Sequence, residues 1–212
     1  MEIVDMNFTV SDITAFIPKT VADFIIEQVA LLDETSTDAV TANKIMVDYS
    51  SLYRKLNKTS ADRAVLEHFT VLDCCRVFLL LQCKKRCPKS FLATLLLIIK
   101  YADDEEKSSI VKGIFFLDDT GDLVNVIIDL CRTNSVDLLI ALGLNNPYTS
   151  KFFPQLNFNQ LVLKLLFCQA DISQVKALLE RKNSKLSDMA NDYKHERINA
   201  NRSVPLNIEL II

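Results

Sequence analysis

Apolar residues recur at intervals of three and four along most of the chain, which is the spacing of one face of an α-helix. The segment 18–32 is an example, because Pro18 can open a helix and apolar residues follow it at this spacing. The next helix, 38–57, is expected to bury Met46, Leu52, Tyr53 and Leu56. The helices predicted before residue 145 cover 18–32, 38–57, 60–86, 88–101, a segment that begins at 103, 120–130 and 136–142. About three more are expected after them.

Signals for β-structure are scarce. The chain has 3 glycines, contains no Asn-Gly or Asp-Gly pair, and rarely alternates apolar and polar residues. These patterns predict an all-α fold of about ten helices packed as antiparallel pairs, as a HEAT-like stack or an irregular bundle. The length of 212 residues favours a single domain. Within it we expect a helical N-terminal half (1–120), a region with polar motifs (121–205) and a short C-terminal tail (206–212).

Charge and composition narrow the function classes. The net charge is -3, and Lys and Arg are scattered among Asp and Glu instead of forming a basic patch, so nucleic-acid binding is not expected. The longest apolar run, 91–99, is much shorter than the roughly 20 residues of a transmembrane helix. The first residues include acidic ones where a signal peptide has a positive region, so export is not expected. The six cysteines lie mostly in apolar helical patterns, which suits a reducing compartment. We therefore expect a cytoplasmic protein with free thiols.

Lys164 is the residue that the apolar pattern makes conspicuous. It lies in a helix that is apolar almost all round, with Gln160 one turn before it on the same face. Because burial of an unpaired charge is costly, Lys164 is expected either to pair with an acid such as Glu196 or Asp192, or to hold a ligand.

Asp118, Asp119 and Asp122 have the spacing with which aspartates can bind magnesium on a diphosphate. The same residues, with Gly121 between them, also suit the N-terminus of a helix, where Asp119 or Thr120 would be the cap. Both interpretations stay open. No phosphate-binding glycine loop and no nucleophilic triad is visible, and no cofactor is predicted.

Four arginines of the second half, Arg132, Arg181, Arg197 and Arg202, could act as forked donors to a carboxylate or a phosphate. Structural roles are equally open for the polar residues around them. Arg181 stands at a helix end, where it could bind carbonyl groups, and the Asn145-Asn146-Pro147 segment could serve only to turn the chain.

A succession of short motifs in the second half resembles the EboA family of bacterial metabolite-traffic proteins. The residues that carry the resemblance are Arg132-Thr133-Asn134, Asn146-Pro147-Tyr148, 159–167, Arg181 with Asn183 and Leu186, Glu196-Arg197, and 202–205. Order and spacing agree over about 75 residues. The family pattern would place tryptophan where Phe158 and Ile208 stand, and glycine near Ala177 and at Asn201.

The resemblance implies a cytoplasmic, non-enzymatic component of a small gene cluster that moves a secondary metabolite or its precursor toward the cell envelope. Its partners would be that metabolite or other proteins of the cluster. The alternatives are a magnesium-dependent enzyme for a prenyl or other phosphorylated precursor, and an interaction scaffold without a small-molecule site. The candidate ligand-binding or network residues are Arg132, Asn134, Asn146, Asn159, Gln160, Lys164, Arg181, Glu196, Arg197 and Arg202.

Overall fold

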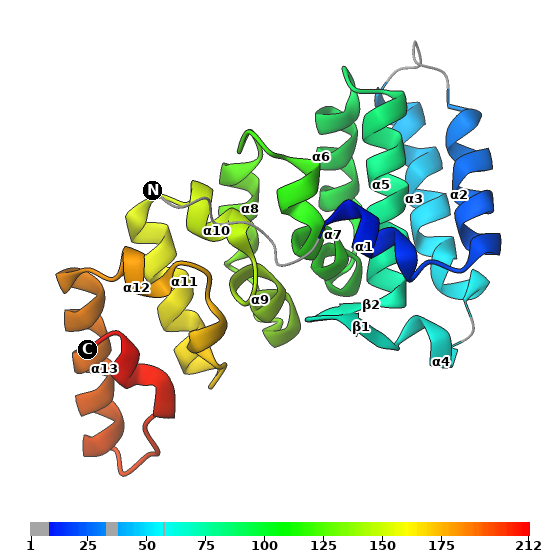
Figure 1. Cartoon of the computed structure of the whole chain (residues 1–212). Coiled ribbons are helices and arrows are strands. Elements are labelled where there is room, and N and C mark those ends of the chain that lie inside the picture. Colours follow the sequence, from blue (N-terminus) through cyan, green and yellow to red (C-terminus); the bar gives the residue numbers. More distant parts are fainter. Residues whose placement is uncertain (1–8, 33–37, 57) are drawn as a thin grey trace. The chain divides into compact units, whose positions relative to one another are not determined.

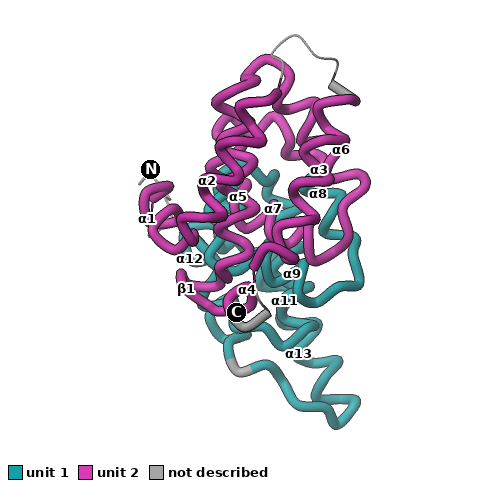
Figure 2. The backbone as a smooth tube through the Cα atoms, turned by 90° about the vertical axis from the view of Figure 1, so that its right-hand side faces the viewer, with its two compact units in different colours: residues 1–6, 127–212 teal, residues 7–126 magenta. Residues whose placement is uncertain are grey.

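A computed structural model describes residues 9–32, 38–56 and 58–212, and α-helices dominate this part of the chain (Figure 1). The all-α prediction is confirmed. Tertiary contacts divide the chain into an N-terminal unit that ends at Val126 and a C-terminal unit that begins at Ile127 (Figure 2). The single domain and the HEAT-like stack stay predictions. Among the described residues, no helix is long and apolar enough to cross a membrane.

The N-terminal unit is built around the helix α5. Its elements are α1 (Val10–Ala15), α2 (Lys19–Ala30), α3 (Asp38–Lys55), α4 (Lys58–Ala61), β1 (Ala64–Leu66), β2 (Phe69–Thr70), α5 (Val71–Arg86), α6 (Phe91–Tyr101), α7 (Asp104–Leu117) and the start of α8 (Val124–Leu130). Helix α5 packs against α1, α2, α3 and α7, and α3 also packs against α6. It is accordingly buried on nearly every side through its first three turns.

The segment that precedes α5 differs from the prediction. Residues 64–70 form an antiparallel hairpin, whereas a helix was expected from residue 60. Thr70 and Asp73 form a capping box, with the Asp73 carboxylate accepting from the Thr70 amide at 2.8 Å, and this box begins α5 at Val71. Glu67 turns the hairpin with φ 40, a left-handed conformation that no Asn-Gly or Asp-Gly signal announced.

The predicted helix 38–57 buries Leu52 and Leu56 as expected, at 0% and 6% exposure, but differs from the prediction at its tyrosines. Tyr49 is 1% exposed and donates from its hydroxyl to the carbonyl of Glu106 at 2.8 Å, whereas Tyr53, which was expected inside, is 36% exposed. The expected acidic first turn of α7 is confirmed, because Asp103 caps the helix and acidic residues occupy positions 104–106.

A charged network crosses the buried interface of α5 and α7. The Asp73 carboxylate pairs with the Lys112 ammonium at 2.6 Å and accepts from the Ser109 hydroxyl at 2.6 Å. Burial opposes the charge on Asp73, but Lys112, Ser109 and the Thr70 amide outweigh it and lower the pKa of Asp73. Arg76, which is 4% exposed, donates to the same serine and to Glu105.

The C-terminal unit holds the region of polar motifs. After the end of α8 it contains α9 (Val136–Gly143), α10 (Pro147–Phe152), α11 (Gln155–Phe167), the 3-10 turn η1 (Ile172–Gln174), α12 (Leu178–Arg181), α13 (Ser184–Asn199) and the 3-10 helix η2 (Leu206–Leu210). Helix α11 packs against α9, α13 and η1. At Gly143 a Cβ would lie 2.4 Å from Leu165 Cδ1, so glycine is what lets α9 approach α11.

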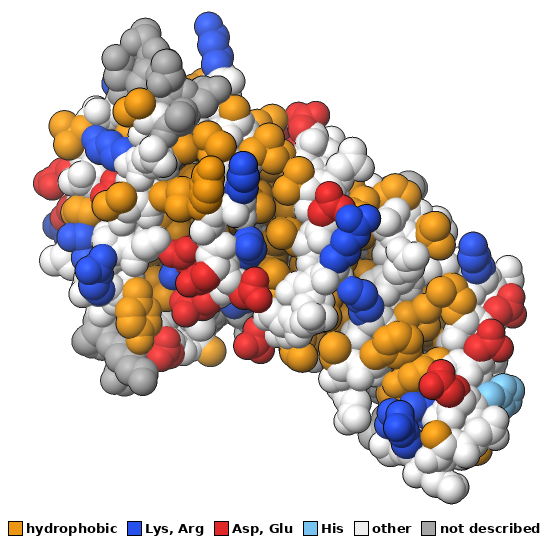
Figure 3. All heavy atoms as spheres, turned by 180° about the vertical axis from the view of Figure 1, so that it is seen from behind, with side chains coloured by type: hydrophobic (Ala, Val, Ile, Leu, Met, Phe, Trp, Pro, Cys, Tyr) orange, Lys and Arg blue, Asp and Glu red, His pale blue; other side chains and the backbone are white. Residues whose placement is uncertain are grey.

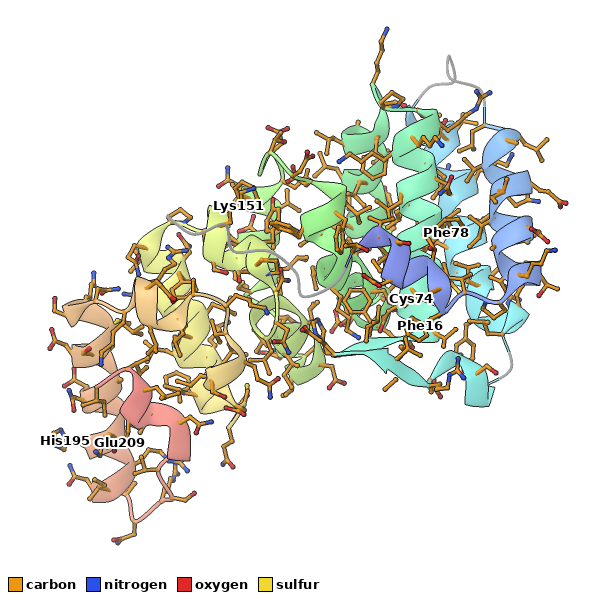
Figure 4. All side chains as sticks on the ribbon, in the orientation of Figure 1. Phe16, Cys74, Phe78, Lys151, His195 and Glu209 are labelled. Carbon is orange, nitrogen blue, oxygen red and sulfur yellow. The ribbon has the colours of Figure 1, made fainter. Side chains whose placement is uncertain are left out.

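The segment predicted as a C-terminal tail is packed onto its unit. Ile208 and Ile211 are fully buried, and Lys182 donates to the carbonyl of Ile212 at 2.6 Å. Glu209 of η2, which is labelled in Figure 4, pairs with Lys194 of α13 at 2.5 Å.

Candidate functional site

A half-open pocket of about 440 Å³ lies within the C-terminal unit. It is lined by the end of α8, the residue after α10, one face of α11 and one residue of α13: Ile128, Cys131, Arg132, Phe153, Asn157, Gln160, Leu161, Leu163, Lys164, Phe167 and Met189. Three predicted residues, Arg132, Gln160 and Lys164, therefore meet at one concavity. The volume falls within the roughly 300–1,000 Å³ that is usual for small-molecule sites.

Helix α11 supplies both the polar and the apolar parts of this lining. Asn157, Gln160 and Lys164 are three and four residues apart, so they follow one another along one side of the helix. Leu161 and Leu163 beside them are buried, at 1% and 6% exposure. The helix thus presents a polar stripe that is bordered by apolar side chains.

Lys164 is half-buried and donates from Nζ to the carbonyl of Cys131, just beyond the end of α8. This contact replaces the expected ion pair, since no carboxylate of the described residues lies within 4.0 Å of Lys164. The physical reason is local, because carbonyls at a helix C-terminus lack partners within the helix and carry partial negative charge. An ammonium has three donor hydrogens, and the bond to Cys131 uses one.

Arg132 follows Cys131 in the chain and lines the same side of the pocket. Its side chain is 81% exposed and pairs with Asp129, three residues earlier, at 3.1 Å. An exposed pair of this kind adds little stability, so Arg132 is free to exchange Asp129 for another anion.

The remaining lining is apolar, apart from one thiol. Phe153 is 3% exposed. Phe167, which is 54% exposed, packs against the Tyr193 ring at a tilt of 53°, with the ring centroids 4.5 Å apart. Burial raises the pKa of the Cys131 thiol to about 12, although the Lys164 ammonium acts in the opposite direction. Cys131 therefore stays protonated near neutral pH and is a poor nucleophile.

Asn159 does not line this pocket, and its side chain joins a network of amides between helices. It is 1% exposed and accepts from the side-chain amide of Gln155 at 2.8 Å. It also exchanges two side-chain hydrogen bonds with Asn183, at 3.1 and 3.2 Å. Asn183 caps α13 by accepting from the Leu186 amide at 3.0 Å. Asn159 and Asn183 therefore fix the start of α13 against α11.

Arg181 stabilises the end of α10. Its guanidinium donates to three carbonyls, those of Thr149 at 3.2 Å, Ser150 at 2.8 Å and Phe153 at 2.8 Å. It also lies over the Phe158 ring, 4.2 Å from the centroid, and partial burial lowers its pKa. The structure thus supports the interpretation of Arg181 as a residue that binds helix-end carbonyls.

Asn146 is 1% exposed and forms the turn before α10. Its side chain accepts from the Tyr148 amide at 3.1 Å and donates to the carbonyl of Ala141 at 3.1 Å. Asn145 before it has φ 51, a conformation that asparagine tolerates well. Asn146 therefore turns the chain and caps a helix.

The other candidates lie at the surface. Asn134, Glu196 and Arg202 are exposed, and Arg197 donates to the carbonyl of Ser203 at 2.8 Å. His195, on the same helix as Glu196, is exposed as well (Figure 4). None of these residues lines the pocket.

The three aspartates of the possible magnesium motif have separate roles in the N-terminal unit. Asp118, which is 1% exposed, accepts from the backbone amides of residues 121, 122 and 123 at 2.8 to 3.1 Å. Asp118 therefore holds the turn before α8, a role that was expected of Asp119 or Thr120. Asp119 pairs with Lys84 at 3.0 Å, and Asp122 accepts from the Thr120 hydroxyl. Within the described ranges, no three His, Cys, Asp or Glu side chains are grouped as metal ligands.

The positions at which the chain departs from the family pattern have clear structural roles. Ala177 and Asn201, where glycine was expected, both have φ 53, which is the left-handed region that glycine adopts most easily. Phe158 and Ile208, where tryptophan was expected, are fully buried and lie outside the pocket lining. Both positions therefore belong to the core, and neither side chain faces the pocket.

Sequence reasoning missed the apolar walls of the pocket. Ile128, Phe153 and Met189 were not singled out, and Leu163 was noted only as part of the motif 159–167. An apolar residue at helical spacing has the same signal whether it faces a core or a cavity. The sequence did offer one indication for Phe167. It is the last residue of α11, and the polar Gln169 follows two positions later.

The fold and the pocket together define an α-helical protein with a small-molecule-sized pocket, apolar over most of its lining and cationic on one side. Hydrophobic side chains also gather over the C-terminal unit on the face shown in Figure 3, where it lies at the right.

The sequence profile of the family described as metabolite traffic protein EboA matches residues 28–212. The chain belongs to the EboA family, and the match includes most of the N-terminal half, which carried none of the motifs. No curated protein and no solved structure matches the chain.

Proposed function

We propose that the chain is a cytoplasmic, non-enzymatic protein that binds a metabolite precursor in the pocket of its C-terminal unit, during trafficking of a secondary metabolite toward the cell envelope. The observation that carries the proposal is the pocket itself. It brings Arg132, Gln160 and Lys164 to one concavity with apolar walls and has the volume of a small-molecule site. The family's description as metabolite traffic proteins supports the same function.

The chemistry of the lining favours binding over catalysis. The lining residues include no Asp, Glu or His, which are the usual general acids and bases. Of its two potential nucleophiles, Cys131 is held as a thiol because burial raises its pKa to about 12, and the Lys164 ammonium is hydrogen-bonded to the Cys131 carbonyl. Arg132 and Lys164 can bind an anion, but the described lining holds no carboxylate or imidazole that would move a proton.

A neutral apolar dye, N-phenyl-1-naphthylamine, tests the pocket directly in the full chain, because its fluorescence rises when it leaves water. Gln160 is exposed and lines the pocket, so Gln160→Trp should fill the opening without disturbing the core. We expect the variant to lose at least tenfold in dye affinity. Lys185→Trp on the exposed side of α13 is the matched control and should bind the dye like the wild type.

The proposal is refuted if the wild type does not bind the dye, or if Gln160→Trp binds it as tightly as Lys185→Trp does. A chain that binds no dye but co-purifies with another protein of its gene cluster would instead support the interaction scaffold.

A further inference from the structure

The charges around the pocket restrict the ligand more narrowly than its volume does. Arg132 and Lys164 are the charged residues of the lining, and both are cations on the side formed by residues 131 and 132. Asp129 neutralises part of the Arg132 charge at 3.1 Å. The net positive charge that faces a ligand is therefore between one and two.

Lys164 has donors to spare. Among the described residues it donates one hydrogen bond, to the Cys131 carbonyl, which leaves two hydrogens of the ammonium for a ligand. The bond to Cys131 also holds the flexible side chain in place, so less side-chain entropy is lost when an anion binds. Arg132 adds a planar fork of donors that matches the two oxygens of a carboxylate.

A group with several negative charges fits this site poorly. A diphosphate is normally held by several cations or by a metal ion, whereas the lining offers two cations, one of which is already paired. A carboxylate brings one negative charge and two acceptor oxygens, which matches the net charge of the lining. Gln160 and Asn157 continue the polar stripe along α11 and can bind further polar atoms of the ligand.

The rest of the lining determines the other end of the ligand. Ile128, Leu161, Leu163, Phe153 and Met189 form an apolar wall that favours a hydrocarbon body. A water molecule takes about 30 Å³ in the liquid. If each non-hydrogen atom of the ligand takes the same volume, a pocket of 440 Å³ accommodates about 15 of them.

We infer that the ligand of this pocket is a monocarboxylate with an apolar body of medium length, its carboxylate bound by Lys164 and Arg132. This inference rests on the proposed function, because it names the chemical class of the metabolite that the pocket binds. The carboxylate lies beside residues 131 and 132, and the apolar body lies along α11.

Displacement of N-phenyl-1-naphthylamine from the full chain tests the inference, with decanoate, decanol and decyl phosphate as competitors. Decanoate and decanol have the same hydrocarbon chain and differ at the head group. We expect decanoate to displace the dye at about tenfold lower concentration than decanol, because a charge-assisted hydrogen bond at a half-exposed site contributes the low end of its usual range.

Variants of the two cations assign this preference to the pocket. Lys164→Gln should reduce the preference for decanoate over decanol to less than threefold, and Arg132→Gln should reduce it in part. The preference is the ratio of two displacements measured on the same variant, so a change in dye affinity cancels from it. Arg132 is 81% exposed, so its replacement does not endanger folding. Lys185→Gln removes one positive charge from the exposed side of α13 and should leave the preference intact.

Equal displacement by decanoate and decanol would overturn the inference and leave the proposed function standing, because the dye would still occupy the pocket. A tenfold advantage of decyl phosphate over decanoate would overturn the choice of a carboxylate. If the preference survives in Lys164→Gln and in Arg132→Gln, the carboxylate is bound elsewhere and the inference is wrong. A chain that binds neither dye nor decanoate refutes the proposed function as well.

Discussion

Replacement of Arg181 by methionine should destabilise the C-terminal unit without changing the pocket. The side chain donates two short bonds, to the carbonyls of Ser150 and Phe153 at 2.8 Å, and two longer ones, to Thr149 at 3.2 Å and Gln155 at 3.4 Å. Methionine keeps much of the apolar stem but makes none of these bonds. Three carbonyls at the end of α10 then lose one donor each, although that of Thr149 still accepts from the Phe153 backbone amide at 3.2 Å.

The magnitude follows from these contacts. Each short bond should contribute about 1 kcal/mol at this half-buried site, and the two longer bonds together about 0.5 kcal/mol. The guanidinium over the Phe158 ring, at 4.2 Å from the centroid, adds roughly 0.5 kcal/mol. The expected loss is about 3 kcal/mol, which lowers the urea midpoint by about 1.5 M at an m-value of about 2 kcal/mol per M.

Urea unfolding followed by circular dichroism measures this loss. Arg132→Met is the matched control, because its side chain is 81% exposed and it should cost less than about 0.5 kcal/mol. Arg181→Lys should lose about half as much as Arg181→Met, since a lysine keeps the charge but cannot bind three carbonyls at once. In the absence of urea, Arg181→Met should still bind the dye like the wild type.

An Arg181→Met midpoint within about 0.3 M of the wild type would refute the assignment of Arg181 to the scaffold, because that difference corresponds to only about 0.6 kcal/mol. A variant that keeps its stability but loses dye binding would show that Arg181 acts on the ligand.

Two further predictions concern backbone strain and pH. Ala177→Gly should stabilise the chain by about 0.5 to 1 kcal/mol and raise Tm by about 2 °C, because relief of the left-handed strain at φ 53 exceeds the entropy cost of glycine. A lower Tm would contradict this. The pKa of Asp73 is lowered in the folded state. Its ionised carboxylate therefore contributes fully to the free energy of unfolding above the pKa of about 3.9 that it has in the unfolded chain, and this contribution is lost as pH falls through the folded-state pKa. Asp73→Asn should therefore be less stable at neutral pH and lose less stability on acidification; parallel pH curves for both proteins in urea unfolding would contradict this.

Hydrophobic spacing identified the helices well and the buried faces less well. Along α3 the spacing correctly predicted that Leu52 is buried, but it did not identify Tyr49, whose hydroxyl binds the carbonyl of Glu106, 57 residues away. The hairpin at 64–70 was missed for a related reason. Its apolar residues have helical spacing, but the capping box of Thr70 and Asp73 begins the helix later.

The polar motifs pointed to the correct region and mixed two kinds of residue within it. Lys164 was singled out as a cation within an apolar helix and Arg181 as a cation at a helix end, and for both a structural role and a ligand-binding role stayed open. Arg181 is committed to carbonyls of residues 149–153, about thirty positions away in sequence, whereas Lys164 keeps donors that face a pocket. Sequence spacing cannot separate these roles, because both depend on which segments the fold brings together.

The sequence by itself determined the all-α class, the acidic start of α7, the family and the unusual position of Lys164. These features are local, because they depend on periodicity, capping and motif order within short segments. Only the tertiary structure decided that Arg132, Gln160 and Lys164 share a pocket, while Asn146, Asn159 and Arg181 hold helix ends in place. That division depends on contacts between residues far apart in the chain. A polar side chain becomes structural or available to a ligand according to whether folding brings an acceptor to it.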